Sequence, residues 1–234
     1  MDVRTTLLAS ILLLAALSPE SALAQYKNTS FGADAGYWLV TKPSIVDADT
    51  GEILQPIERP LRLANGFRLG GEVNFKLDAD HWWLSNRFNV GFMQYHESQN
   101  ATEFERQYDR QAKEALGTIM GLQIGIGVRY FFLTDRVRPY VQGGASYMHL
   151  LSFRDMSSNC QIPLDAICPG ATSNAAAFLP RRNLIIGHLR PGLEVIVARD
   201  TAIHLFADLQ QWFVINAADN QAIVLGAGLN LYGG

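Results

Sequence analysis

The sequence predicts an all-β chain folded as a single eight-stranded antiparallel transmembrane barrel, with long extracellular loops and short periplasmic turns. Apolar and other side chains alternate with period two in eight separate segments. Those segments run for about 11 to 17 residues, whereas tilted membrane strands need roughly 9–11 and soluble strands centre near 5–6. The connections between them also alternate between long and short. A soluble sandwich has no reason for that ordering, so a membrane barrel is favoured.

The alternation is easiest to see in residues 66–77. One face is mostly apolar and carries Phe67, Leu69, Gly71, Val73, Phe75 and Leu77. The opposite face carries the charged residues Arg68, Glu72 and Lys76, which a dry core does not accept without partners. We therefore predict a strand with one face toward lipid and the other toward a polar lumen.

The other seven strands repeat this pattern. In chain order they are predicted at residues 30–40, 82–95, 117–133, 138–150, 184–198, 202–213 and 222–232. Pro191 lies inside one of them on the apolar face, and proline cannot donate a ladder hydrogen bond. We therefore predict a bulge or a local kink at Pro191.

The connections fix the orientation of the barrel. The long ones are residues 41–65, 97–116, 152–181 and, less markedly, 214–221; the short ones are 78–80, 134–137 and 199–201. Outer-membrane barrels have short periplasmic turns and longer external loops, so every long connection is predicted to lie outside. Within 97–116, the side chains of Phe104, Tyr108, Gln111 and Ala115 recur at helical spacing. A short helix and a solvated extension of the hairpin both remain open there.

The first 24 residues have the features of a signal peptide. Arg4 precedes an apolar run from Leu7 to Leu17, and Ala22-Leu23-Ala24 matches a small-x-small cleavage site. The run is shorter than the roughly 20 residues that a membrane span needs. We therefore expect residues 1–24 to be removed and residues 25–234 to form one barrel domain.

Charge and cysteine content exclude several classes of function. The net charge of −3 gives no basic excess for nucleic acid. Cys160 and Cys168 lie close together, and in an exported chain this favours a local disulfide that staples the 152–181 loop. Two cysteines with no histidine nearby are too few for a structural zinc site. No cofactor or metal is predicted.

The predicted lumen carries a nearly balanced set of charges. These nine residues are Asp34, Arg68, Glu72, Lys76, Arg87, Arg129, Arg190, Glu194 and Asp208. A selective pore favours a ring of one sign, whereas a balanced set favours ion pairs across the lumen. Since eight strands enclose a space just wide enough for side chains, we predict a plugged barrel.

The signal peptide, the eight alternating segments and the closing sequence GAGLNLYGG resemble the small outer-membrane barrels of the OmpA, OmpX and OmpW type. The resemblance implies an integral protein of the Gram-negative cell outer membrane, in contact with its lipids and lipopolysaccharide. Such barrels usually end on an aromatic residue. Here Tyr232 is followed by Gly233 and Gly234, which departs from that pattern.

The function expected from these features is structural or interactive and not enzymatic. The 97–116 and 152–181 loops are the expected sites for a protein partner. The alternative is a narrow porin-like transporter of small or apolar solutes, as attributed to OmpW-like proteins. A lesser alternative is a lipid A-modifying enzyme. Its only candidate constellations are His96 with Glu97 and Ser98, and His149 near Ser152, and neither matches a known motif.

Overall fold

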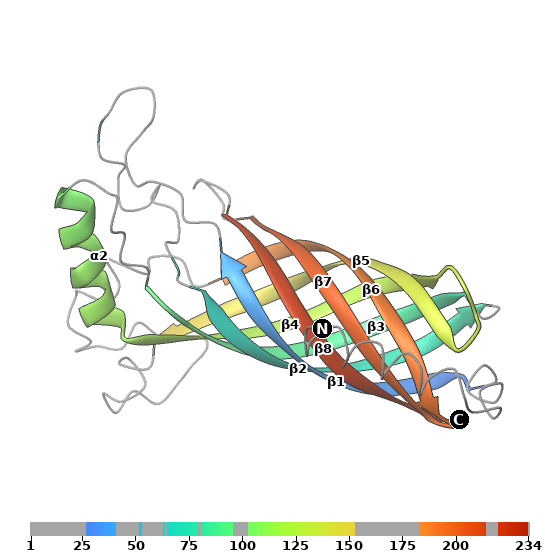
Figure 1. Ribbon diagram of the computed structural model, residues 1–234. Helices are drawn as coiled ribbons and strands as arrows, with labels where there is room; N and C mark the ends of the chain where they lie inside the picture. Colours follow the sequence, from blue (N-terminus) through green and yellow to red (C-terminus); the bar gives the residue numbers. More distant parts are fainter. Residues whose placement is uncertain are drawn as a thin grey trace, which may run out of the picture.

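The chain forms a closed barrel in which each strand pairs with the next and the last pairs with the first (Figure 1). The computed structural model describes residues 27–40, 52, 63, 65–78, 81–95, 103–152, 183–213 and 220–233. The predicted signal peptide, Cys160 and Cys168 lie outside these residues. Among the described residues, no helix has the length and apolar character needed to cross a membrane.

All eight predicted strands are present, and each begins and ends within two residues of its predicted bounds. They are β1 (Thr29–Val40), β2 (Gly66–Asp78), β3 (Trp82–Gln94), β4 (Thr118–Phe131), β5 (Val137–Ser152), β6 (Asn183–Ala198), β7 (Thr201–Phe213) and β8 (Asn220–Gly233). All neighbouring pairs are antiparallel. The predicted fold class, an all-β antiparallel barrel of eight strands, is therefore confirmed.

Pairing between β1 and β8 closes the barrel. It runs the whole length of β1, from Thr29 opposite Gly233 to Val40 opposite Ala222. Closure gives the backbone groups of both terminal strands a partner, so the sheet keeps no free edge. Side chains then alternate between the outer wall and the lumen along every strand.

The bulge predicted at Pro191 is not found. On one side Pro191 stays in register opposite Val141 of β5. On the other side the ladder to β7 passes from the pair Leu189–Leu209 to the pair Gly192–Phe206 without a shift. The pairs of Arg190 and Pro191 are missing there, because proline has no N–H to donate. The register shift in this hairpin lies instead between Ile196 and Ala198, beside the short turn.

A helix, α2 (Glu103–Leu116), lies at the end of the barrel that we call the loop end, opposite the end of β8 (Figure 1). The predicted helix is confirmed, whereas the alternative of an extended hairpin is wrong. Its buried face is offset from the predicted one: Tyr108, Ala112 and Leu116 are buried and Gln111 is exposed. Gly117, with a φ of 62°, ends the helix in the left-handed conformation that favours glycine.

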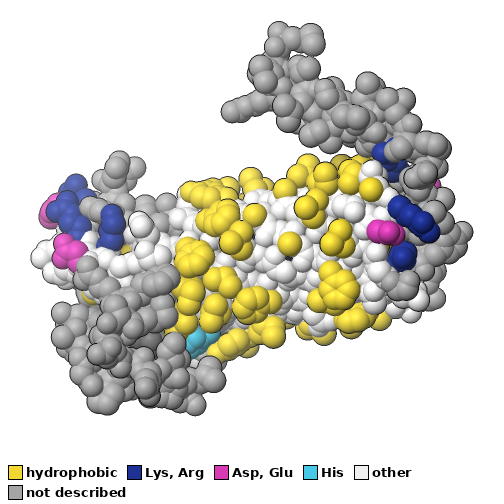
Figure 2. Space-filling view, turned by 90° about the horizontal axis from the view of Figure 1, so that it is seen from below, with side chains coloured by type: hydrophobic (Ala, Val, Ile, Leu, Met, Phe, Trp, Pro, Cys, Tyr) yellow, Lys and Arg dark blue, Asp and Glu magenta, His cyan; other side chains and the backbone are white. Residues whose placement is uncertain are grey.

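The outer wall is apolar between two charged ends. On the face shown in Figure 2, hydrophobic side chains form a broad belt across the middle of the barrel, and charged side chains gather at its ends. Ile124 at the middle of β4 exposes 63% of its surface. Toward the short turns, the ring of Tyr130 lies 4.6 Å from that of Trp82 and 5.3 Å from that of Phe132. This placement matches the aromatic girdles of membrane barrels.

Candidate functional site

The candidate site is the polar filling of the lumen, which we call the lumen network. Eight of the nine predicted residues are buried inside the barrel: Asp34, Arg68, Glu72, Arg87, Arg129, Arg190, Glu194 and Asp208. The ninth, Lys76, is only partly buried and lies near the short-turn end of β2. Residues two apart on a strand point to the same side of the sheet, and in a closed barrel one side of every strand faces the lumen. The inward side chains of different strands therefore meet there.

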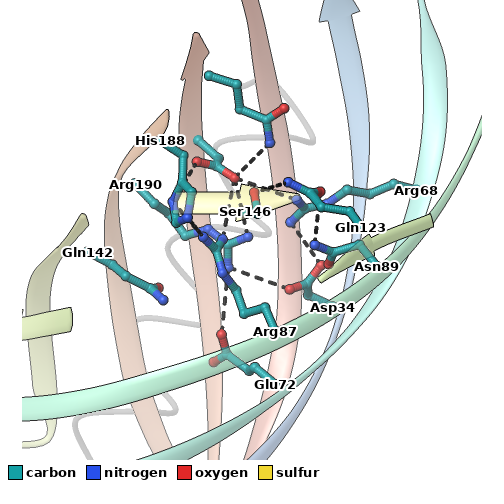
Figure 3. A network of polar contacts seen from close by, with 12 residues as sticks. Asp34, Arg68, Glu72, Arg87, Asn89, Gln123, Gln142, Ser146, His188 and Arg190 are labelled. Carbon is teal, nitrogen blue, oxygen red and sulfur yellow. Dashed lines mark hydrogen bonds and ion pairs between the residues drawn. The ribbon is translucent and has the colours of Figure 1, made fainter. Parts of the chain in front are cut away.

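The centre of the lumen network is Asp208 on β7. Its Oδ2 atom lies 3.5 Å from a guanidinium nitrogen of each of Arg68, Arg87 and Arg190. Those arginines come from β2, β3 and β6, so one carboxylate joins three other strands across the lumen. In Figure 3 the three arginine side chains converge on the interior of the barrel.

Arg190 contacts carboxylates on three strands. Besides Asp208, it lies 3.5 Å from Asp34 on β1 and 3.7 Å from Glu72 on β2. Asp34 also accepts a hydrogen bond from Arg68 at 3.1 Å. The guanidinium carbon of Arg190 lies 4.0 Å from the ring centroid of Phe206, within the range of a cation–π contact. Each charge in this region therefore has a partner of opposite sign.

A second group lies around Glu72 and Arg129. Arg129 on β4 donates a hydrogen bond of 2.6 Å to Oε1 of Glu72 and one of 3.1 Å to Gln142. Asn74 donates to the same Glu72 oxygen at 3.2 Å. The guanidinium carbon of Arg129 lies 4.7 Å from the ring centroid of Tyr140. Glu72 links this group to Arg190, so the two groups form one connected network.

A third group closes the lumen toward the short turns and contains a residue that the sequence analysis missed. Arg138 forms an ion pair with Glu194 and donates to the hydroxyl of Tyr232 at 2.5 Å. Glu194 also accepts a hydrogen bond of 2.6 Å from the Tyr232 hydroxyl and one of 2.5 Å from the side-chain amide of Asn230. Arg138 and Gln142 are an even number of residues apart on β5, so their side chains point to the same side of the sheet. This alternation could have identified Arg138 as a lumen residue.

Neutral polar side chains and histidines also fill the lumen, and they too were absent from the predicted set. Asn89 donates to Gln123 at 3.1 Å, and Gln123 donates to Ser146 at 2.6 Å, which joins β3, β4 and β5 (Figure 3). His188 lies beside Arg87, with 2.5 Å between a ring nitrogen and Nη2. His204 is buried beside the ring of Phe206, with 5.7 Å between the ring centroids.

An apolar layer separates the lumen network from the loop end. Trp38 and Trp212 meet edge to face, with ring centroids 6.3 Å apart, and both donate to Gln210, at 3.2 and 3.1 Å. Met93 and Met148 are buried at the same end of the barrel. The lumen is therefore filled with packed side chains from the loop end to the short turns.

Of the two candidate catalytic constellations, the structure describes only His149 with Ser152. His96, Glu97 and Ser98 lie outside the described residues. His149 does not pair with Ser152: its Nδ1 lies 2.7 Å from Oδ1 of Asn183, whereas Ser152 donates inward to the Leu116 carbonyl at 2.7 Å. The two residues are three apart on one strand and so point to opposite sides of the sheet. Among the described residues, no cluster of three metal-ligating side chains occurs.

No protein-family model matches this chain, and no curated protein matches it. Solved structures do. The chain is similar to Neisserial surface protein A (NspA), with a TM-score of 0.50 at 12% identity over 88% of this chain and 97% of that one. It is also similar to OprG from Pseudomonas aeruginosa, with a TM-score of 0.43 at 12% identity over 90% and 100%. Ail of Yersinia pestis gives a TM-score of 0.40 at 13% identity over 88% and 99%. The likeness to NspA confirms the fold that the sequence resemblance implied, that of the small eight-stranded outer-membrane barrels.

Proposed function

We propose that this chain is an integral protein of the bacterial outer membrane, whose filled barrel is a rigid anchor that presents its loop end to partners. The observation that carries the proposal is the lumen network together with the tryptophan layer above it. A barrel whose interior is occupied by paired charges holds its shape and offers no wide path for solutes.

The apolar outer wall supports the membrane location. Large hydrophobic side chains are exposed along all the strands: Ile124 and Ile126 on β4, Leu205 on β7 and Leu225 on β8 are each at least half exposed. A soluble monomer rarely exposes so large a contiguous apolar surface. Lipid removes the cost of that exposure, and barrel closure satisfies the backbone groups within the hydrocarbon.

The filled lumen supports a structural role over transport. Trp38, Trp212 and Gln210 form a bonded layer across the loop end. Below it, Arg68, Arg190 and Asp208 are completely buried. Opening a path would separate buried ion pairs, and breaking such a pair typically costs about 3–5 kcal/mol.

The loop end supplies the surface for partners. Helix α2 buries one face and exposes charged residues of both signs on the other, including Glu103 and Arg106, which pair at 2.6 Å. Three polar side chains meet on the outer wall, where Tyr147 donates to Asn183 at 2.6 Å and His149 contacts the same oxygen. These groups suit the headgroup level of lipids or lipopolysaccharide, while the 97–116 and 152–181 loops remain the proposed sites for a protein partner.

The proposal does not include catalysis. His149 has an orienting partner in Asn183, but its neighbours on the outer wall across the two ladders, Leu122 and Asn183, supply no nucleophile. A change in the mass of lipid A on overexpression of the chain would contradict this part of the proposal.

Planar-bilayer conductance of the purified barrel tests the structural role against the alternative of a narrow transporter. We expect no steady channel openings from the wild-type chain. A Trp38→Ala/Trp212→Ala variant, in which the apolar layer is removed and the lumen network is kept, should also stay closed. Steady openings from the wild-type chain would overturn the structural role and favour transport. A pulldown with and without residues 152–181 tests whether that loop binds a protein.

A further inference from the structure

The outer wall has a hollow near the loop end of β1 to β4, which we call the wall notch. Its volume is about 260 Å³. Three aromatic side chains, Tyr37, Phe67 and Phe92, line it on the outer face of the barrel. Polar groups of Asn65, Gln94 and Thr118 line the side nearer the strand ends. Among the described residues that line the wall notch, none carries a charged side chain.

The wall notch arises because β2 starts lower than both of its neighbours. The β1–β2 ladder ends at the pair Trp38–Gly66, yet β1 continues along β8 to Val40. The β2–β3 ladder ends at the pair Phe67–Phe92, yet β3 continues along β4 to Gln94. Above this point, the part of the chain that the structure describes contains an isolated bridge between Leu63 and Tyr95. The regular strand pairing therefore has a short gap between β1 and β3 at the start of β2, where Asn65 accepts a hydrogen bond from the backbone N–H of Val40 at 3.2 Å.

Gly66 makes the wall thin at the bottom of this gap. A Cβ atom there would lie 2.7 Å from Cγ of Met93 and would also contact the carbonyl oxygen of Phe92. Met93 points into the lumen and is only 1% exposed, yet it belongs to the lining of the wall notch. Met93 thus contributes to the lining of the notch from the wall beneath it, and sulfur-containing side chains adapt well to apolar ligands.

The lining of the wall notch changes from apolar to polar along the barrel axis, toward the loop end. Below the aromatic residues the outer wall continues through Leu69 and Val90, which face each other on β2 and β3. The lining residues nearer the strand ends include the amide residues Asn65 and Gln94, and Oδ1 of Asn65 already accepts a hydrogen bond from Val40. The wall notch therefore extends the lipid-facing belt upward and ends at neutral hydrogen-bonding groups.

We propose that the wall notch seats one acyl chain of a bilayer lipid, which enters sideways from the outer leaflet. The inference rests on the proposed membrane location. The aromatic residues hold the chain laterally, Met93 contacts it from below, and the amides bind the uncharged ester region of the same lipid. A hollow of this size is smaller than the roughly 300–1,000 Å³ of pockets for drug-sized ligands, which suits a single chain segment.

Photo-cross-linking in a bilayer tests the proposal. The barrel is reconstituted into phosphatidylcholine nanodiscs in which part of the lipid carries a diazirine in an acyl chain. After illumination, the labelled residues are mapped by mass spectrometry. Met93 is the informative position, and Met148 is its matched control, because Met148 is equally buried and near Met93 but is not part of the notch. A Cβ atom on Gly121 would lie within 3.3 Å of both side chains.

We expect labels on Met93 and on belt residues such as Ile124, with Met148 at background. A Gln94→Trp variant, in which the notch is filled, should lose the Met93 label and keep the belt labels. A matched Gln211→Trp variant on the outer wall of β7 should keep both.

Three outcomes would overturn the lipid seat and leave the membrane location intact. They are belt labels without a Met93 label, a Met148 label as strong as that of Met93, and a Gln94→Trp variant that keeps the Met93 label. An absence of all labels would overturn both the lipid seat and the membrane location.

Discussion

Arg129 on β4 donates a 2.6 Å hydrogen bond across the lumen to Glu72 on β2, and both side chains are buried. The two strands are not neighbours in the sheet, since β3 lies between them. The bond therefore spans the interior of the barrel and ties together strands that share no backbone ladder. It contributes to the stability of the barrel in addition to the backbone hydrogen bonds of the ladders.

Removal of either partner alone should destabilise the barrel. An Arg129→Met variant leaves Glu72 with a weaker set of partners, because Arg190 is 3.7 Å away. Breaking a buried pair in this way typically costs about 3–5 kcal/mol. We expect the midpoint of denaturant unfolding in detergent to fall clearly. An Arg106→Met variant on the exposed face of α2 is the control, since surface pairs contribute about 0–1 kcal/mol.

The same pair should show strong coupling in a double-mutant cycle. An Arg129→Met/Glu72→Leu variant removes both charges, and so leaves neither one buried without its partner. It should lose less stability than the two single variants added together, by about 0.5–3 kcal/mol, the range for residues in contact. Additive losses in the same unfolding assay would show that the two side chains stabilise the barrel independently.

Asp208 should matter more than Asp34. Asp208 lies 3.5 Å from three arginines, whereas Asp34 lies within 3.5 Å of two, Arg68 and Arg190. An Asp208→Asn variant keeps the shape of the side chain but leaves more positive charge uncompensated. Its unfolding midpoint should therefore fall further than that of the matched Asp34→Asn variant. An equal or larger fall for Asp34→Asn would contradict the central role given to Asp208.

Alanine substitutions at two glycines distinguish the cost of a packing collision from the effect of replacing a glycine in a strand. A Cβ atom at Gly91 would collide with the ring of Trp38, whereas one at Gly143 would have nothing within 4 Å. Gly91→Ala should therefore destabilise the barrel by about 1–3 kcal/mol, the usual cost of overpacking a core. Gly143→Ala should be close to neutral. Heat modifiability on gel electrophoresis gives a simple first measurement for both, and similar behaviour of the two variants would rule out the packing explanation.

Lysine substitutions on β4 test the membrane location itself. Ile124 lies at the middle of the wall and is 63% exposed, while Leu133 lies just beyond the short-turn end of β4 and is 50% exposed. In a bilayer, Ile124→Lys should cost about 2–4 kcal/mol and Leu133→Lys about 0–1 kcal/mol, because the cost depends on depth. In a water-soluble barrel both substitutions would be nearly neutral. Folding stability in liposomes distinguishes the two cases, and equal small effects would refute the proposed location.

The strands, and the side of the sheet to which each side chain points, could be predicted from the sequence alone. Both are local properties: a residue such as Arg68 or Glu72 faces away from Phe67 because successive side chains on a strand alternate. The same reasoning explains an error. His149 and Ser152 were grouped because they are near in sequence, but their separation by an odd number of residues sends them to opposite sides of β5.

Which of the inward residues meet could not be predicted in this way, because it depends on how the eight strands are staggered. Arg190 contacts acids on β1, β2 and β7, and no local pattern states how far those strands are shifted against β6. The same stagger buries Arg138, which was not predicted to be part of the network, beside Glu194, and it leaves the predicted Lys76 partly exposed. Side-chain direction depends on one strand, whereas the depth of a side chain in the barrel depends on the register of all eight.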